Sequence, residues 1–182
     1  MTDGGPRRIG VSIEVKPHAY DPVTNPELFE GVLPRRVLAF VIDLVILSIP
    51  VLILGAFVVA STIATLGLAA ILFALLSPLL WPLIVIWAVC YYGFTLGSPA
   101  SATIGMRVMD LEMRTWYGSP AYFVLGAVHA VVFWASVSIL TPFILLVAFF
   151  NDRHRLLHDM LVGTVVINNS ERAAAIRQAP GP

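Results

Sequence analysis

The feature that most constrains this chain is the length of its uncharged apolar stretches. Between Val37 and Met106 the only charged side chain is Asp43, and between Thr115 and Asn151 there is none. Across the whole chain 58% of residues are hydrophobic and only 12% are charged, with a mean hydropathy of +0.87. Water-soluble domains carry roughly twice that share of charge, about 25%. The sequence therefore predicts a membrane protein whose apolar segments are long enough to cross a bilayer.

Net charge and motifs narrow the function classes. Eleven basic and eleven acidic residues give a formal net charge of zero, which provides no excess positive charge for a nucleic-acid partner. The chain contains no Walker loop, no dinucleotide-binding glycine motif, no Gly-x-Ser-x-Gly and no His-Glu-x2-His. We therefore expect neither an enzyme nor a bound cofactor.

Three apolar regions follow one another along the chain. Residues 34–60 are long enough for one full crossing at about 1.5 Å per residue, and residues 68–94 for a second. The polar but uncharged residues 61–67 between them predict a tight turn at the far membrane face. Residues 120–150 would extend roughly 46 Å as one straight helix, which is too long for a simple crossing.

Arginines indicate the topology, because cytoplasmic loops are enriched in positive charge. They occur before the first region, in the central loop and after the last region, but not in the 61–67 turn: Arg35, Arg36, Arg107, Arg114, Arg153 and Arg155. If all three groups are cytoplasmic, the number of membrane segments is even. We predict four, with the last two short or re-entrant and a bend near Thr141-Pro142. The alternative is three crossings with the C-terminus outside.

The resulting fold class is an all-α membrane protein, a polytopic helical bundle in the plasma membrane. We expect residues 1–31 to form a flexible cytoplasmic tail, residues 32–167 the transmembrane domain and residues 168–182 a flexible C-terminal tail. Within the central loop, residues 104–110 alternate in a way that predicts a short extended segment at the membrane surface.

Asp43 is a functional candidate because an ionisable side chain inside a bilayer costs several kcal/mol, about 3 on insertion scales. Arg36 lies seven residues earlier, on nearly the same face of a helix and about 10 Å away along its axis. A water molecule or another helix is needed to close that gap. The alternative is that Asp43 only satisfies nearby donors and fixes helix packing.

A second polar group follows the last apolar region. Asp159 and His158 enter a semi-apolar stretch, while Arg155 precedes Asp159 by four residues and is able to pair with it along a helix. His154 and His158 have metal-ligand spacing, but no third ligand stands out, so we expect no metal site. His129, alone in the third apolar region, is a candidate for proton relay or for hydrogen-bonded packing.

Three segments carry a resemblance to a known family. They are residues 36–43, the turn 97–99 with residues 104–108, and residues 157–166. In this order they resemble the RDD family of bacterial membrane proteins, over about residues 32–167. The family is named for one arginine and two aspartates, which correspond to Arg36, Asp43 and Asp159. Members commonly have a Thr-Pro-Gly-Lys-like turn where this chain has Ser98-Pro99-Ala100-Ser101.

The resemblance implies transport of ligands that are unidentified, with cation/proton exchange among the proposals for the family. Our first hypothesis is a transport protein in which Arg36, Asp43 and Asp159 form one buried cluster that binds a small cation or proton. His129, His158 and Arg155 are secondary candidates. Such a small chain is expected to contact lipids and to assemble with copies of itself. The rival hypothesis is an accessory protein whose Arg/Asp network fixes packing and which binds a membrane-protein partner.

Overall fold

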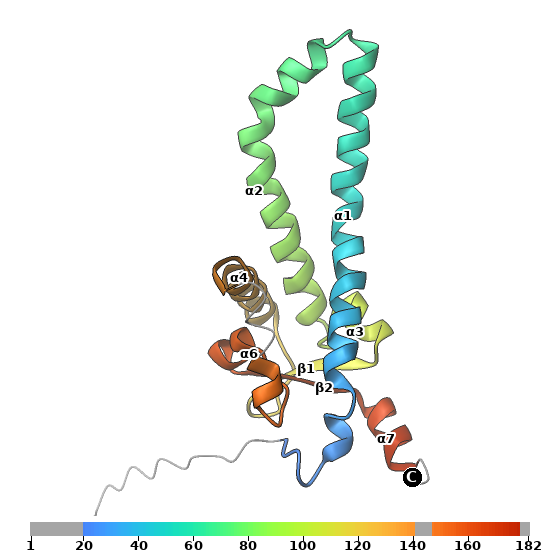
Figure 1. Ribbon diagram of the computed structural model, residues 1–182, viewed down its shortest axis with the longest axis vertical. Helices are drawn as coiled ribbons and strands as arrows, with labels where there is room; N and C mark the ends of the chain where they lie inside the picture. Colours follow the sequence, from blue (N-terminus) through green and yellow to red (C-terminus); the bar gives the residue numbers. More distant parts are fainter. Residues whose placement is uncertain (1–19, 141–146, 179–182) are drawn as a thin grey trace, which may run out of the picture.

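The computed structural model describes residues 20–140 and 147–178. A long helical hairpin stands on a compact base, and the base contains every described element other than the two hairpin helices (Figure 1). In chain order the elements are η1 (Pro26–Leu28), α1 (Val32–Ala64), α2 (Leu68–Leu96), α3 (Ile104–Val108), β1 (Leu111–Thr115), α4 (Phe123–Leu140), η2 (Val147–Phe150), α6 (Leu157–Val162), β2 (Thr164–Asn168) and α7 (Ser170–Gln178).

Helices α1 and α2 confirm the two predicted apolar helices. They are the two described helices that are long and apolar enough to cross a membrane, with mean hydropathies of 2.9 and 2.4 over their most apolar windows. Leu66 and Gly67, with φ of 51° and 96°, make the turn between them. Far from the base the side chains of both helices are exposed, for example Phe57 at 61% and Leu75 at 74%. Apolar surface of this extent indicates contact with lipid.

The central loop differs from the predicted extended segment. Its first part is helix α3, and the Thr103 side chain caps this helix by accepting a hydrogen bond from the Met106 N–H. Asp110, with φ of 54°, then reverses the chain into strand β1. Residues 104–110, predicted to be one extended segment, therefore contain a short helix and the residues that lead into β1.

Strands β1 and β2 form an antiparallel two-stranded sheet in the base, where an all-helical bundle was predicted. Leu111 pairs with Asn168, and Thr115 pairs with Thr164. All five residues of β2 are buried, and Leu111 and Met113 of β1 are buried as well. Burial of β2 on both faces explains its nearly unbroken apolar sequence, which shows no strand alternation.

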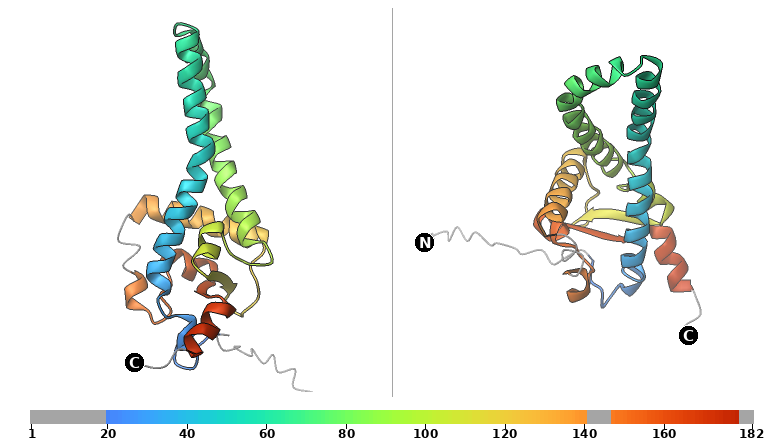
Figure 2. Two further views of the ribbon diagram at one scale, coloured as in Figure 1. Left: turned by 90° about the vertical axis from the view of Figure 1, so that its right-hand side faces the viewer. Right: turned by 45° about the horizontal axis from the view of Figure 1, so that its top comes forward.

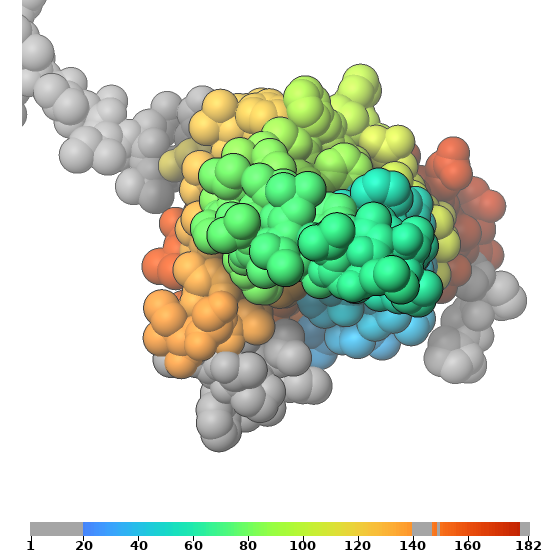
Figure 3. Space-filling view, turned by 90° about the horizontal axis from the view of Figure 1, so that it is seen from above, coloured from blue at the N-terminus to red at the C-terminus, as the bar shows by residue number. Residues whose placement is uncertain are grey.

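Helix α4 lies crosswise to the hairpin. It is seen nearly end-on in Figure 1 and runs across the view after a quarter turn in Figure 2. It packs against α2 and α6, and Gly126 allows close approach because a Cβ there would lie 2.9 Å from the Tyr92 carbonyl oxygen. From above, α4 flanks the hairpin on one side (Figure 3).

The last apolar region was predicted from the sequence to form two short or re-entrant membrane segments. The predicted bend at Thr141-Pro142 lies outside the described residues. After it, the described chain forms only the short elements η2 and α6 before β2, so no second long apolar helix follows α4 among residues 147–178. The apolar composition of residues 123–140 did not show that α4 lies crosswise to the hairpin.

The two predicted tails are folded where the structure describes them. Residues 20–31 include η1, and the C-terminal segment forms helix α7 instead of a flexible tail. The Asn168 side chain donates to the carbonyl oxygens of Glu27 and Glu30 at 2.8 and 2.9 Å, and Arg177 donates to the Glu27 carboxylate at 2.7 Å. The N-terminal and C-terminal segments are held by hydrogen bonds to each other. The sequence of either segment alone therefore does not predict that it is folded.

Candidate functional site

Asp43 joins three elements at the base of the hairpin. Its Oδ1 accepts hydrogen bonds from the Tyr91 hydroxyl at 2.5 Å and from the Gly105 N–H at 2.8 Å. Its Oδ2 accepts from the Thr103 hydroxyl at 2.6 Å. The residue is only 3% exposed. Through these three hydrogen bonds Asp43 ties α1 to both α2 and α3.

Gly105 makes this connection sterically feasible. A Cβ at this position would overlap the Ala39 carbonyl oxygen and would lie 2.9 Å from the Asp43 carboxyl carbon. The absence of a side chain therefore lets the first turn of α3 lie directly on α1. The N–H of the same residue is one of the three donors to Asp43.

Arg36 pairs with Asp159 across more than a hundred positions of sequence. Its Nη1 lies 2.6 Å from Asp159 Oδ2, and the same nitrogen donates to the His154 carbonyl oxygen at 3.3 Å. The Leu156 N–H also donates to Oδ2, at 2.9 Å. The Asp159 side chain is fully buried, and that of Arg36 is 11% exposed. This ion pair attaches α6 to the first turns of α1.

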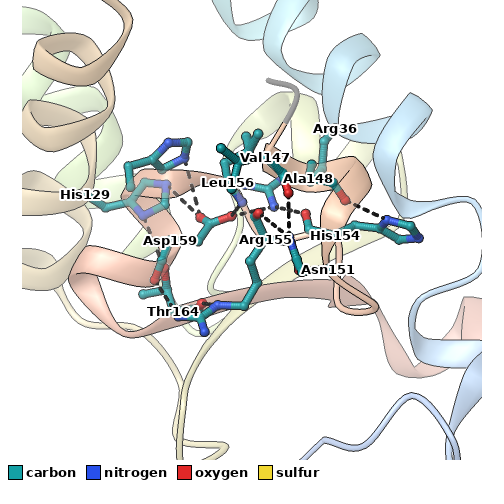
Figure 4. A network of polar contacts seen from close by, with 11 residues as sticks. Arg36, His129, Val147, Ala148, Asn151, His154, Arg155, Leu156, Asp159 and Thr164 are labelled. Carbon is teal, nitrogen blue, oxygen red and sulfur yellow. Dashed lines mark hydrogen bonds and ion pairs between the residues drawn. The ribbon is translucent and has the colours of Figure 1, made fainter. Parts of the chain in front are cut away.

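Two histidines face the other oxygen of Asp159. The Nε2 atoms of His158 and His129 lie 3.4 and 3.8 Å from Oδ1, and the two rings contact each other edge-on (Figure 4). On the far side of its ring, His129 Nδ1 lies 3.3 Å from the Thr164 hydroxyl oxygen. Together with Arg36 these residues form the Asp159 cluster, defined here as Arg36, His129, His158 and Asp159.

Burial and neighbouring groups shift the pKa values of His158 and Asp159 in this cluster. Burial lowers the pKa of His158 to about 3, so this ring is neutral. Burial raises the pKa of Asp159, but the charge and hydrogen bond of Arg36 together with the two neighbouring histidines outweigh burial and hold that pKa below its usual range. Asp159 is therefore a buried carboxylate whose charge is balanced by one guanidinium.

Arg155 supports the cluster from outside. Its guanidinium donates to the carbonyl oxygens of Thr164 and Asp159, both at 2.8 Å, and lies 4.5 Å from the centre of the Trp116 ring. The predicted pairing of Arg155 with the Asp159 carboxylate along a helix is wrong, because Arg155 precedes α6 and contacts the backbone. Its contacts fix the turn between α6 and β2.

A cavity of about 290 Å³ lies between the two sets of polar contacts. Its polar lining consists of Arg36, Asp43, Thr103, His129 and His158. The remaining lining is apolar and comes from α1, α2, α4 and the base: Leu33, Val37, Ala39, Phe40, Tyr92, Leu96, Met106, Met113, Phe133, Val137, Leu156 and Val166. The Phe40 and Phe133 rings, 5.4 Å apart between centroids, connect α1 to α4 beside it.

The predicted triad is therefore divided in space. Arg36 and Asp159 form an ion pair, whereas Asp43 has its own three donors, and the cavity adjoins both. The secondary candidates His129, His158 and Arg155 all gather around Asp159. The functional roles of these residues stay predictions.

The sequence analysis missed three partners of Asp43. Tyr91 and Thr103 were not singled out, and Gly105 was part of the predicted extended segment 104–110. A Ser/Thr residue before a short helical turn with glycine at its second position is the signal available for the last two. The metal-ligand spacing of His154 and His158 requires both to lie on one helix, but His154 precedes α6 and has a φ of 48°, so they do not.

These features define a class: a helical membrane protein with an apolar hairpin and a polar, cavity-containing base. The RDD family model matches residues 31–163. The chain belongs to the RDD family, as the resemblance of its three segments predicted. No curated protein and no solved structure matches the chain.

Proposed function

We propose that this protein binds a small ion or solute in the cavity at the foot of its hairpin and assists its passage through the plasma membrane. The observation that carries the proposal is the cavity of about 290 Å³, which has charged and polar groups on one part of its wall and apolar side chains on the rest. Binding sites for small ligands combine an apolar lining with a few convergent polar groups in this way.

The polar groups at the cavity differ in their freedom to bind a ligand. Asp43 has three hydrogen-bond donors and serves the fold. In the Asp159 cluster, by contrast, Asp159 Oδ1 and His158 Nδ1 are buried and have no hydrogen-bond partner among the described residues. Unsatisfied buried groups are rare in folded proteins and are often explained by an ion or water. The Asp159 cluster is therefore the polar end of the proposed site.

The same proposal places the membrane around the upper hairpin. Helix α1 has 33 residues and is about 50 Å long, whereas a hydrocarbon core of ~30 Å needs only about 20 residues. A bilayer that covers α1 from the turn at Ala64 downward therefore ends near Asp43. Arg36 then lies at the interface, and the polar cluster lies in the folded base and not at the bilayer centre.

In this topology the chain crosses the membrane twice. The number of membrane segments is still even, but it is two instead of the four expected from the sequence. All six arginines that suggested a cytoplasmic side lie in the base or in the first turns of α1 beside it, so the base faces the cytoplasm. Helix α4 lies in the interface beside the hairpin, with Val124 and Val131 among its exposed side chains. Val37, which lines the cavity and is 50% exposed, then lies near the boundary between lipid and water.

A bulky side chain at the cavity wall tests the proposal. Val37 lines the cavity and is 50% exposed, whereas Val41, one turn further along α1, is 49% exposed and does not line it. We expect Val37→Trp to lower the flux of a coupled cation at least ~10-fold by occluding the site, and Val41→Trp to leave it unchanged. The measurement is proton flux driven by a sodium or potassium gradient in proteoliposomes, read with an entrapped pH dye.

The controls for this measurement are protein-free liposomes and both tryptophan variants at equal protein density. Equal rates in wild-type and protein-free liposomes would contradict transport of these ions. Equal, nonzero rates for Val37→Trp and Val41→Trp would show that the ion passes elsewhere.

The rival function, an accessory protein acting through a membrane partner, is favoured by one observation. Both carboxyl oxygens of Asp43 already accept hydrogen bonds from the protein, so this residue holds the helices together. A static network is expected to do this. This function predicts no flux in either variant and recovery of a stoichiometric membrane protein when the chain is purified in mild detergent. A homo-oligomer instead gives a single species with a mass that is a multiple of the chain mass.

A further inference from the structure

Three ligand-type atoms converge inside the Asp159 cluster. His129, His158 and Asp159 each offer one ligand atom within 4.8 Å of the other two, and the Nε2 atoms of His129 and His158 lie 3.8 and 3.4 Å from Asp159 Oδ1. A tetrahedral metal ion with bonds of about 2.0–2.1 Å holds its ligand atoms roughly 3.4 Å apart. The two distances to the carboxylate oxygen are therefore already near the spacing that such an ion imposes.

The contacts among these atoms do not satisfy the carboxylate. Asp159 is 0% exposed, yet Oδ1 has no hydrogen-bond partner among the described residues. Both histidines direct a ring nitrogen toward this oxygen without forming a hydrogen bond to it. A buried carboxylate oxygen without a donor costs free energy, and a cation bound between it and the two rings removes that cost.

The surrounding groups orient two of the three residues, His129 and Asp159. The Thr164 hydroxyl lies 3.3 Å from His129 Nδ1, the ring nitrogen opposite the carboxylate. Oδ2 of Asp159 is held by Arg36 and the Leu156 N–H, which leaves Oδ1 as the oxygen that faces the rings. Metal-binding histidines and carboxylates are usually oriented by a hydrogen bond at their second nitrogen or oxygen.

We infer that His129, His158 and Asp159 form a binding site for one divalent transition-metal ion of the zinc and cobalt class. Two imidazole nitrogens and one carboxylate oxygen suit these ions, whereas Mg²⁺ and Ca²⁺ prefer oxygen ligands alone. His129 and His158 also line the cavity, so a fourth coordination position opens into it, as in zinc sites that bind a water or a ligand.

This site goes beyond the proposed transport function and replaces the expectation that the chain binds no metal. That expectation considered His154 with His158 and found no third ligand. The structure supplies a different set, because α4 brings His129 to α6. Arg36 places a positive charge next to the site and weakens the attraction for a cation, but it contacts the other carboxylate oxygen.

The experiment measures metal binding in detergent, separately from flux. Full-length protein with a histidine-free tag is treated with a chelator and titrated with Co²⁺, whose visible absorption reports coordination, and Zn²⁺ is then added in competition. We expect one Co²⁺ per chain, displaced by Zn²⁺. Since loss of an orienting partner alone costs 10–100-fold in affinity, His129→Gln and His158→Gln should each lower affinity at least ~10-fold.

His154→Gln is the matched control, because His154 lies in the same segment and outside the converging atoms. Its affinity should equal that of the wild type. A melting temperature that rises with Zn²⁺ in the wild type and in His154→Gln, but not in His129→Gln, supports the site by a second readout. Absence of a Co²⁺ band in the wild type, or equal affinity in wild type and His129→Gln, would overturn the inference.

Discussion

Replacing Gly105 by alanine is expected to separate α3 from α1 and to reduce the yield of folded protein to a small fraction of wild type. The new Cβ overlaps the Ala39 carbonyl oxygen, which is part of the α1 backbone and unable to rotate away. Overpacking typically costs about 1–3 kcal/mol, and this substitution also displaces a donor to Asp43. We expect a loss above ~3 kcal/mol, a large part of a typical stability of 5–15 kcal/mol. Size-exclusion profiles and melting temperatures in detergent measure it.

Gly55→Ala is the matched control for this prediction. Gly55 lies in α1, the helix against which Gly105 packs, and a Cβ there would have nothing within 4 Å. Alanine in a helix interior is favoured over glycine by roughly 0.5–1 kcal/mol, so this variant should melt at or slightly above the wild-type temperature. A Gly105→Ala protein that melts like Gly55→Ala would contradict the close packing of α3 on α1.

Replacing Arg36 by methionine is expected to have the second large effect. Removing one member of a buried ion pair costs about 3–5 kcal/mol, because the remaining charge stays buried without a partner. Asp159 is fully buried, so its carboxylate is left in this state. The melting temperature in detergent should fall strongly, and the Arg36→Met/Asp159→Asn double variant should recover part of the loss.

The neighbouring Arg35→Met variant provides the control. Arg35 lies 3.9 Å from Asp110, whose side chain is 48% exposed, and such surface pairs contribute about 0–1 kcal/mol. If Arg35→Met and Arg36→Met lower the melting temperature equally, the Arg36–Asp159 pair is not the contact that attaches α6 to α1. Strict additivity of the two substitutions in the double variant would lead to the same conclusion.

The hairpin was predictable from sequence because its signal is local. Some twenty consecutive apolar residues suffice for a crossing, and α1 and α2 each exceed that number. The orientation of α4 was not predictable in this way. Its sequence is as apolar as that of a crossing helix, and its position depends on packing against α2, where Gly126 meets Tyr92.

In the candidate site, likewise, the important residues were predictable from the sequence, whereas the contacts between distant residues were not. Asp43 was found because it is charged within an apolar stretch, and the family resemblance joined it to Arg36 and Asp159, but sequence spacing did not show which aspartate Arg36 contacts. That choice depends on where β2 and α6 lie, and both are placed by the pairing of β2 with β1, more than fifty positions earlier. The third metal-type ligand, His129, was missed for the same reason.

The central claim is that two helices cross the membrane and that the whole base lies on the cytoplasmic side. Cysteine labelling tests it most directly, in a Cys90→Ser background with one new cysteine at either Ala64 in the hairpin turn or Glu171 in α7, both exposed. With a membrane-impermeant maleimide, we predict labelling of Ala64→Cys in intact cells and of Glu171→Cys only after lysis. Labelling of Glu171→Cys in intact cells, or equal labelling of both positions, would contradict the account.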